Sequence, residues 1–291
     1  MGSLQERWLA DEMKVVEIVW PLLVAATEFC PLETEPTYGF LLDSARRDAE
    51  EGHSNGETPV VRYVHPLLPA GQAGLRSGSK LLALNGEDAT QWTPSEVMRR
   101  ASVAALARIQ PLMVRVSLRG RIEEVPITAV SSCRYRLVVI QDEAVNAFAD
   151  GKAIAVTRGL LRMVRSDAEL ALVIAHEIAH NALAHSQTAQ LDQALRAVLS
   201  AHVVKGVDVG PPKSRHEFEL AADRIGLYIV ARAGYEPQRA IDFWRRMALL
   251  PSHADDAYGR DHPSTEERLE SLEQAAEVLA VKQVKGDPLR P

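Results

Sequence analysis

The segment His176-Glu177-Ile178-Ala179-His180 carries the residue types best suited to metal chemistry in this sequence. It lies in a run without Gly or Pro, Leu170 to His185, which predicts a helix with both histidines on one face. Two imidazoles at this spacing are about 6 Å apart and can reach one metal ion. Glu177 points away from the pair, but it can reach a water beside the ion and act as a general base. The alternative is a helix with two surface histidines, but the apolar residues before His176 predict burial, and buried histidines need partners.

A catalytic zinc ion also needs a third protein ligand and an open position. His185 lies about 140° around the helix from His180, which favours an ordinary polar residue near the helix end. Glu219 and Asp223 are one turn apart on a separate predicted helix, where one carboxylate could bind zinc while the other holds a ligand histidine. The alternative is two solvated acids on a charged helix. The remaining candidates with suitable donor atoms are His216, Glu217 and His262.

Spacing and turn signals predict the elements that must position these residues. A capping box, Ser166 to Glu169, opens the helix that carries the two histidines. Two strands are expected shortly before it, Arg136 to Gln141 and Lys152 to Thr157. A first helix near the N-terminus should kink or end at Pro21, and a last helix should run to about Val281.

Residues 36–128 have a different texture, with short β-type runs separated by turns. Strands are expected at Val60 to Val64 and at Lys80 to Leu84. Leu112 to Leu118 and Ile122 to Thr128 flank Arg119-Gly120, an arrangement that is typical of a hairpin. This region is therefore predicted to be a β-rich domain inserted after the first helix.

Composition limits the class of protein. The chain has 291 residues, 46% hydrophobic and 25% charged, which allows one large or two modest domains and argues against disorder. A formal net charge of −6 argues against a dedicated nucleic-acid binder. The best apolar run, Ile18 to Thr27, is shorter than the ~20 residues of a membrane helix, and the N-terminus lacks the pattern of a signal peptide. We therefore expect a soluble globular protein with no transmembrane segment in this chain.

Two cysteines, Cys30 and Cys133, fit no C-x-x-C motif and no thiolate zinc site. They could form one disulfide, which would indicate an oxidising compartment, or remain two buried thiols. Their spacing favours neither alternative.

Four motifs occur in a characteristic order: H-E-I-A-H at His176, E-L-A-A-D-R-I-G-L at Glu219, A-G-Y-E-P at Ala233 and H-P-S-T-E-E-R-L at His262. Together they resemble the gluzincin family of zinc metallopeptidases that includes the Oma-type, HtpX-type and periplasmic BepA-type proteases and the CAAX prenyl proteases. The resemblance covers at least residues 133–275. One departure, Ala221 in place of a second acidic residue, lies outside the implied ligands.

The resemblance implies that His176, His180 and Glu219 bind one Zn²⁺ per chain and that Glu177 activates the water. Asp223 would orient His176. His262 would lie close to the zinc, where it either stabilises the oxyanion or fills the fourth position; the alternative is a histidine that merely precedes a helix cap.

The resemblance also implies a substrate-binding strand. Asn146, Ala147 and Phe148 would form an edge strand that pairs with an extended substrate.

The β-rich region resembles a bacterial PDZ domain over residues 36–128. The run from Pro69 to Asp88 resembles the centre of that module, and Tyr38, Gly39 and Phe40 resemble the loop that accepts a peptide carboxylate through backbone N–H groups. Such a domain binds a peptide as an added strand. The alternative is a β-rich domain that only packs against the rest of the chain.

These observations predict an α+β fold: a mainly helical zincin-type metallopeptidase domain with a small sheet, plus an inserted β-rich PDZ-like domain. The expected domains are an N-terminal helix over 1–35, the PDZ-like domain over 36–128 and the zinc metallopeptidase domain over 129–291. The implied function is zinc-dependent endopeptidase activity on unfolded or misfolded proteins, with the PDZ domain selecting substrates or regulating cleavage.

Two other functions are weighed against it. A chaperone-like or scaffold protein with an idle zinc site would have no use for the base Glu177, and a zinc hydrolase of another bond type is disfavoured by the motifs. The expected partners are polypeptide substrates and a peptide ligand of the PDZ domain, with no nucleic acid. The expected location is the periplasm or another extracytoplasmic compartment of a bacterium; the alternative is the cytoplasm.

Overall fold

The computed structural model describes residues 4–30, 33–44, 58–188, 215–249 and 266–289. The chain forms two compact units: unit 1 comprises Met1–Thr34 and Cys133–Pro291, and unit 2 comprises Glu35–Ser132. The boundaries expected from the sequence fell after residues 35 and 128. Each unit has its own hydrophobic core, so unit 1 is a domain made of two chain segments, and unit 2 is inserted between them.

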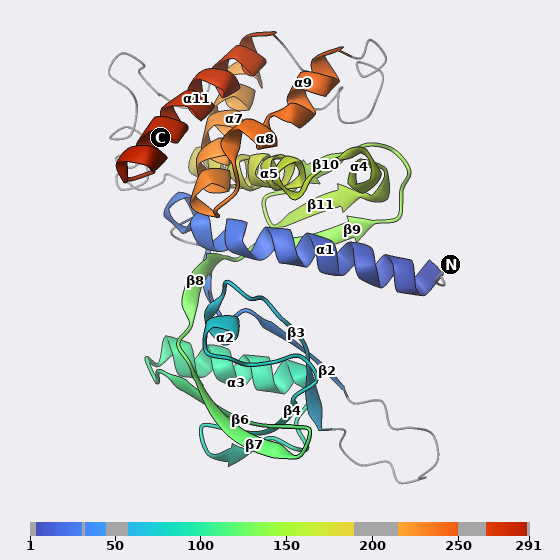
Figure 1. Cartoon of the computed structure of the whole chain (residues 1–291), viewed down its shortest axis with the longest axis vertical. Helices are drawn as coiled ribbons and strands as arrows, with labels where there is room; N and C mark the ends of the chain where they lie inside the picture. The colour runs from blue at the N-terminus through green and yellow to red at the C-terminus, as the bar shows by residue number, and fades with distance from the viewer. Residues whose placement is uncertain (1–3, 31–32, 45–57, 189–214, 250–265, 290–291) are drawn as a thin grey trace. The chain divides into compact units, whose positions relative to one another are not determined.

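Unit 1 is mainly helical, with a small sheet. Its sheet has the order β10-β11-β9, in which β10 is antiparallel to β11 and β11 is parallel to β9. The helix α5 packs on β10 and β11, while α1 packs on α5 and β9 (Figure 1). The main elements of unit 1 are α1 (Leu4–Ala25), β9 (Arg136–Ile140), β10 (Ala147–Ala149), β11 (Ala153–Thr157), α4 (Arg158–Met163), α5 (Asp167–Thr188), α7 (Arg215–Arg232), α8 (Pro237–Ala240), α9 (Asp242–Leu249) and α11 (Glu266–Lys285).

The helix α5 lies in the centre of the unit 1 core. Its residues from Leu170 to Ala175 are 0% exposed, because an apolar run of this length cannot face water on any side. The predicted capping box is confirmed: the Glu169 N–H donates to Ser166 Oγ at 3.3 Å, and the Glu169 carboxylate accepts from the Arg165 N–H at 2.7 Å. The predicted strands at Arg136 and Lys152 are also confirmed as β9 and β11.

The helix α1 differs from the expectation at Pro21. It continues through this proline to Ala25. A proline inside a helix costs about 3 kcal/mol, but one face of α1, with Ile18, Val19, Leu22 and Leu23, is buried in the core. Tertiary packing therefore outweighs the local penalty at Pro21.

Unit 2 is β-rich, as predicted, and the α+β class of the chain is confirmed. Its strands form a six-stranded sheet with the order β2-β3-β4-β6-β7, and β5 pairs with β4. The predicted hairpin is confirmed as β6 and β7, which pair antiparallel. The elements of unit 2 are β2 (Phe40–Ser44), β3 (Pro59–Val64), α2 (Pro69–Gln72), β4 (Lys80–Leu84), β5 (Glu87–Asp88), α3 (Pro94–Leu106), β6 (Leu112–Leu118) and β7 (Arg121–Ile127).

The chain passes between the units twice, and the two passing segments are bonded to each other. We call these segments, residues 33–37 with Cys30 and residues 130–134, the neck. The strands β1 (Thr34–Thr37) and β8 (Val130–Cys133) pair with each other. The Arg134 N–H donates to the Glu33 carbonyl at 2.7 Å. Cys30 and Cys133 form a disulfide, with 5.9 Å between their Cα atoms. The alternative of two free thiols is therefore wrong.

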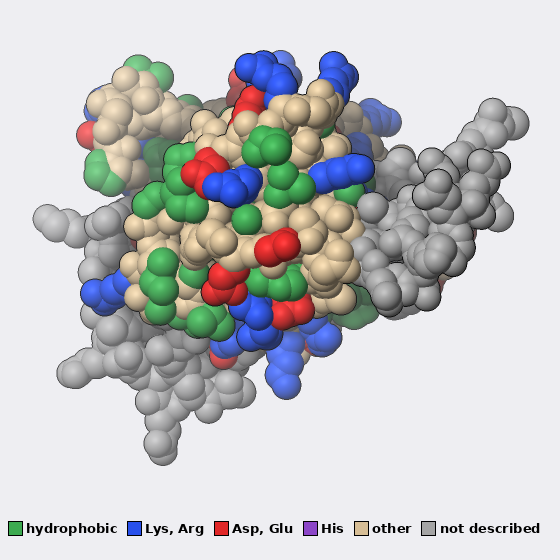
Figure 2. Space-filling model, turned by 90° about the horizontal axis from the view of Figure 1, so that it is seen from below, with side chains coloured by type: hydrophobic (Ala, Val, Ile, Leu, Met, Phe, Trp, Pro, Cys, Tyr) green, Lys and Arg blue, Asp and Glu red, His purple; other side chains and the backbone are tan. Residues whose placement is uncertain are grey.

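The surface of unit 2 mixes charges of both signs. Arg115 pairs with Glu124 across the β6–β7 hairpin at 2.9 Å, and Arg100 pairs with Glu87 at 2.6 Å. Figure 2 shows one face of the molecule, on which basic, acidic and apolar side chains are interspersed. Among the helices that the structure describes, none combines the length and the apolar character needed to cross a bilayer.

Candidate metal centre

The candidate metal ligands lie where α5 and α7 approach each other closely. Gly226 of α7 makes this possible, because a Cβ atom there would lie 3.0 Å from the backbone nitrogen of His176. Asp223 and Glu219 lie one and two turns before Gly226 on α7, so they share its face toward α5. The close approach brings both carboxylates to the two histidines of α5.

Three side chains converge on one point. The Nε2 atoms of His176 and His180 are 2.9 Å apart. Glu219 Oε2 lies 3.3 Å from His176 Nε2, and Glu219 Oε1 lies 3.4 Å from His180 Nε2. One ligand atom from each residue lies within 4.8 Å of the others. The i, i+4 spacing on α5 and the single carboxylate from α7 thus give two nitrogens and one oxygen.

Asp223 holds the opposite ring nitrogen of His176. Its Oδ1 lies 2.9 Å from His176 Nδ1, and both side chains are buried. Burial alone would lower the pKa of His176, but the hydrogen bond and charge of Asp223, joined by Glu219, outweigh it and raise this pKa to about 9. Burial alone would raise the pKa of Asp223, but the Arg268 guanidinium and His176 hold it below its ordinary value. Asp223 is thus a carboxylate that fixes the ring orientation of His176.

Arg268 is part of the site, although the sequence reasoning gave it no role. It comes from α11, is 1% exposed, and binds Asp223 with a fork: Nε to Oδ2 at 2.6 Å and Nη2 to Oδ1 at 2.7 Å. Its Nη1 lies 3.0 Å from Glu219 Oε2. The available signal was its place in the H-P-S-T-E-E-R-L motif, since an arginine among so many helical charges has no distinctive spacing.

Aromatic rings border both histidines. The Phe218 ring stacks on His180 with 5.0 Å between centroids and 20° between planes. Trp244 lies beside His176, with 6.0 Å between centroids. These rings restrict the rotation of the two imidazoles.

Glu177 lies on α5, whereas the predicted substrate strand lies at β10. Glu177 is 1% exposed on α5, one residue after His176. The predicted strand residues lie at and just before β10, where Asn146 accepts from the Thr157 N–H at 3.0 Å and the Phe148 side chain is 40% exposed. β10 is an edge of its sheet among the described strands.

In the part of the chain that the structure describes, none of the other candidate residues joins His176, His180 and Glu219. Glu217 is exposed on α7. His262 lies outside the residues that the structure describes. Tyr38 and Phe40 belong to the core of unit 2, where each is 1% exposed, and the Tyr38 hydroxyl donates to the Ala101 carbonyl at 2.9 Å. Gly39 between them has φ +81°, which favours glycine.

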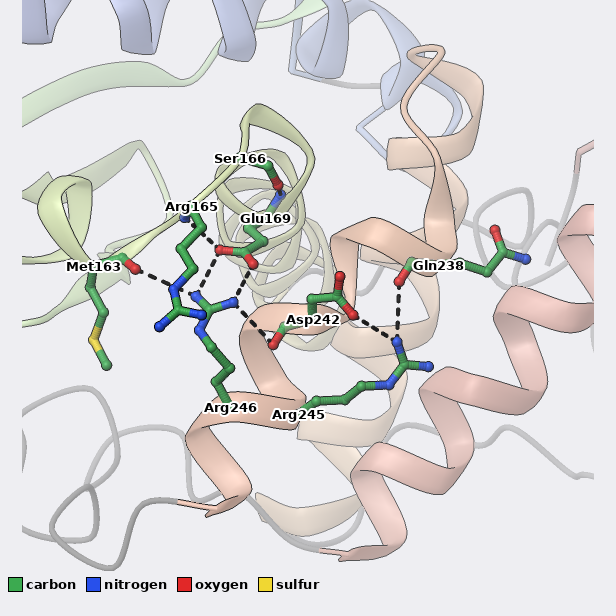
Figure 3. Close-up of polar contacts among 8 residues, drawn as sticks. All are labelled: Met163, Arg165, Ser166, Glu169, Gln238, Asp242, Arg245 and Arg246. Atoms are coloured by element: carbon green, nitrogen blue, oxygen red, sulfur yellow. Dashed lines mark hydrogen bonds and ion pairs between the residues drawn. The ribbon is translucent and has the colours of Figure 1, made fainter.

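The beginning of α5 is anchored to α9, as Figure 3 shows. The Arg246 guanidinium forms two bonds with the buried Glu169 carboxylate, one of them at 2.8 Å, and also donates to the Met163 carbonyl at 3.4 Å. Because Glu169 also caps α5, this ion pair fixes the helix that carries both histidines.

The donor set fits zinc, which takes imidazole nitrogens and a carboxylate oxygen in catalytic sites and keeps one position open. Two histidines one turn apart on a helix, a glutamate between them and a glutamate from a second helix define the class of zinc metallopeptidases.

Comparison with known proteins gives the family. The sequence pattern described as "Peptidase family M48" matches residues 118–210 and 210–276. This chain belongs to Peptidase family M48, whose members are metal-dependent, typically with zinc.

Several known proteins are similar in sequence. The chain is 29% identical to "Mitochondrial metalloendopeptidase OMA1" of Schizosaccharomyces pombe over 211 residues, which cover 66% of this chain and 61% of that protein. It is 32% identical to the Arabidopsis thaliana protein of the same name, covering 48% of this chain and 31% of that protein. It is 27% identical to "Putative beta-barrel assembly-enhancing protease" of Vibrio cholerae, covering 51% of this chain and 36% of that protein. The chain therefore spans less than two thirds of these relatives.

Solved structures match about a third of the chain. The HtrA3 PDZ domain bound to a phage-derived ligand matches with a TM-score of 0.27 and 16% identity, covering 34% of this chain and 88% of that one. The PDZ domain of EpsC from Vibrio cholerae matches with a TM-score of 0.23 and 22% identity, covering 31% of this chain and 94% of that one. These TM-scores are low, and unit 2 is defined by its own strands and helices.

Proposed function

We propose that this chain is a zinc-dependent endopeptidase that hydrolyses peptide bonds of unfolded or misfolded proteins. The observation that carries the proposal is the convergence of His176, His180 and Glu219, with Glu177 beside them on the same helix. Membership of Peptidase family M48 supports it.

The residues would share the chemistry as follows. A zinc ion held by His176, His180 and Glu219 would lower the pKa of a water molecule toward neutrality and polarise a substrate carbonyl. Glu177 would accept the proton of that water and pass it to the leaving amine. Asp223 would keep His176 oriented through Nδ1, at the observed 2.9 Å. His262 is proposed to assist at the oxyanion or to fill the fourth position.

Two edge strands are proposed to bind polypeptide. Asn146, Ala147 and Phe148 lie at β10, an edge strand packed against the metal helix. In unit 2, β2 begins at Phe40, lies beside α3 and is an edge strand among the strands that the structure describes. Because the rings of Tyr38 and Phe40 are buried, a peptide would be held by backbone groups at Tyr38, Gly39 and Phe40. Unit 2 would thus act as a PDZ-type module that selects substrates or regulates cleavage.

The proposed location is the periplasm or another extracytoplasmic compartment of a bacterium, rather than the cytoplasm. The disulfide Cys30–Cys133 supports an oxidising compartment. One set of relatives carries the name beta-barrel assembly-enhancing protease, and another is named mitochondrial.

The test compares the wild type with Glu177→Gln. Zinc content and cleavage of casein, an unfolded protein, are measured with and without chelator. Wild type should bind one zinc per chain and cleave casein, while Glu177→Gln should keep the zinc and lose activity by about 100-fold or more, because the general base is gone. Glu217→Gln, a change at an exposed glutamate of α7, is the matched control and should behave as wild type.

Full proteolysis by Glu177→Gln would overturn the proposal. A wild type that binds zinc and suppresses aggregation of unfolded proteins without cutting them would support the chaperone-like alternative instead.

A further inference from the structure

One buried amide connects the metal helix to the proposed substrate strand. Asn181 directly follows His180 on α5 and is 1% exposed. Its Oδ1 accepts from the Gly151 N–H at 2.6 Å, and its Nδ2 donates to the Ala153 carbonyl at 3.2 Å. Gly151 and Ala153 belong to the turn between β10 and β11 and to the first residue of β11. Both ends of the amide therefore hold the turn that follows the edge strand.

The register of β10 shows which backbone groups this turn controls. The Thr157 N–H donates to the Asn146 carbonyl at 3.0 Å, and the Asp150 N–H donates to the Ala153 carbonyl at 3.3 Å. In an antiparallel ladder, alternate residues direct their N–H and C=O groups to the neighbouring strand. Residues 146, 148 and 150 therefore direct these groups to β11, while Ala147 and Ala149 direct theirs away from it, and of these two only Ala149 is partly exposed.

This pattern indicates which backbone groups of β10 would bind an added strand. An added strand would exchange main-chain hydrogen bonds with Ala149, which is partly exposed, whereas Phe148 would contribute its exposed ring. Ala147 is 0% exposed and β10 packs on α5, so small side chains keep the strand close to the metal helix.

We propose that Asn181 is a positioning residue, which fixes β10 along α5 so that an extended substrate aligns its scissile bond with the metal residues. The inference rests on the proposed function and deepens it. Asn181 is adjacent in sequence to His180, so the same turn of α5 supplies a metal ligand and the anchor of the strand. Asn181 would act through the backbone of residues 150–153 and would not touch the substrate.

Removal of the amide should leave the fold intact. The Ala153 carbonyl also accepts from the Asp150 N–H, so it keeps one partner. Gly151 is only half-buried, so water can replace the lost acceptor of its N–H. The effect is therefore expected at the turn and the strand, and not in the core.

The test begins with the bond that the wild type cleaves in casein. A ten-residue peptide centred on that bond spans β10, and a four-residue peptide with the same bond does not. For Asn181→Ala we expect kcat/KM on the ten-residue peptide to fall by about 10- to 100-fold, because a displacement near 1 Å has this effect on a reaction. The four-residue peptide should be affected much less.

Two readouts do not depend on activity. Zinc affinity, measured by chelator competition, should stay within about twofold of wild type, because no ligand is changed. Amide hydrogen exchange of residues 147–153 should become faster in the metal-free protein. Asn85→Gly is the matched control: it also removes an amide oxygen that accepts a backbone N–H, that of Met113 at 2.8 Å, but in unit 2, and glycine suits its φ of +50°. It should match wild type on both peptides.

Asn181→Asp provides a second variant with the same shape. It keeps the acceptor for Gly151 but puts a carboxylate oxygen in place of the donor against the buried Ala153 carbonyl, so the ten-residue peptide should again be cleaved more slowly than by wild type, while the four-residue peptide is affected much less. An equal loss on both peptides, or a loss of zinc affinity that parallels the loss of activity, would overturn the inference. A wild type that cleaves no peptide bond would instead refute the proposed function.

Discussion

A single arginine balances the charges around His176. Glu219 and Asp223 are carboxylates one helical turn apart, and both are buried. Arg268 binds both of them, at 3.0 Å and at 2.6 and 2.7 Å. Buried charges are tolerated when they are paired in this way. The arginine therefore lets one helix present a ligand and the carboxylate that orients another ligand.

Replacement of Arg268 tests this balance. In Arg268→Met the fork to Asp223 is lost, so Asp223 and Glu219 are less well oriented, and the zinc dissociation constant should rise by about 10- to 100-fold. Arg268→Lys should recover only part of the affinity, because an ammonium keeps the charge but not the fork. Competition with a chelator measures the zinc dissociation constants of both variants. Arg239→Met, at an exposed arginine paired with Glu236, should have no effect; wild-type affinity in Arg268→Met would contradict the argument.

The sequence predicts some of these residues far better than others. His176, His180, Glu219 and Asp223 repeat at helical spacing, so local geometry already places each pair on one face. Arg268 is 45 residues from Asp223 along the chain, and Asn181 meets Gly151 across 30 residues. Contacts of this kind have no period in the sequence, so they appear only once the helices are packed.

At the scale of elements, the distance between α5 and α7 controls the site. Gly226 faces the backbone of His176, and a Cβ atom would lie 3.0 Å from its nitrogen and 3.2 Å from its Cα. Helix backbone cannot yield as a flexible side chain would. The glycine therefore lets α7 approach α5 closely enough for Glu219 to reach the histidines.

Gly226→Ala separates this effect from ordinary helix propensity. In a helix interior, alanine normally stabilises by about 1 kcal/mol relative to glycine. Here the added methyl group should push α7 away from α5, so that both the melting temperature and the zinc affinity fall. Calorimetry of the metal-free protein and chelator competition check the two effects. A higher melting temperature with unchanged affinity would show that the helices have room for a side chain.

Element boundaries were predicted well where packing and propensity agree. The predicted run from Leu170 to His185 lies within α5, whose capping residues were visible in the sequence. The sequence does not predict the end of α1, because proline is locally unfavourable in a helix while the burial of Ile18 and Leu22 favours continuation. Burial of this kind depends on the tertiary fold, which spacing alone does not supply.

The whole molecule is a peptidase-type unit with a second unit inserted through the neck. At the neck the chain leaves and re-enters unit 1 at nearly the same place, since the Arg134 N–H bonds the Glu33 carbonyl at 2.7 Å. Insertions whose ends are close are tolerated because they need little distortion of the host. Unit 1 should therefore fold without its insert.

Deletion of residues 35–132, with two glycines joining Thr34 to Cys133, tests this separation. The shortened chain should fold, bind one zinc ion and cleave the four-residue peptide as the full chain does, because every metal residue lies in unit 1. Its KM for casein should rise, because the proposed peptide-binding strand β2 is gone. Circular dichroism, metal content and cleavage kinetics provide the measurements. Failure to fold would show that unit 2 is required for unit 1.

The disulfide at the neck also gives the chain a covalent topology. Cys30 and Cys133 are 103 residues apart, so all of unit 2 lies on a closed ring of chain. One cut anywhere in that ring opens it but releases nothing, and the mass changes only by one water molecule. An endopeptidase that nicked its own insert would thus stay in one piece, and the nick would show on a gel only after reduction.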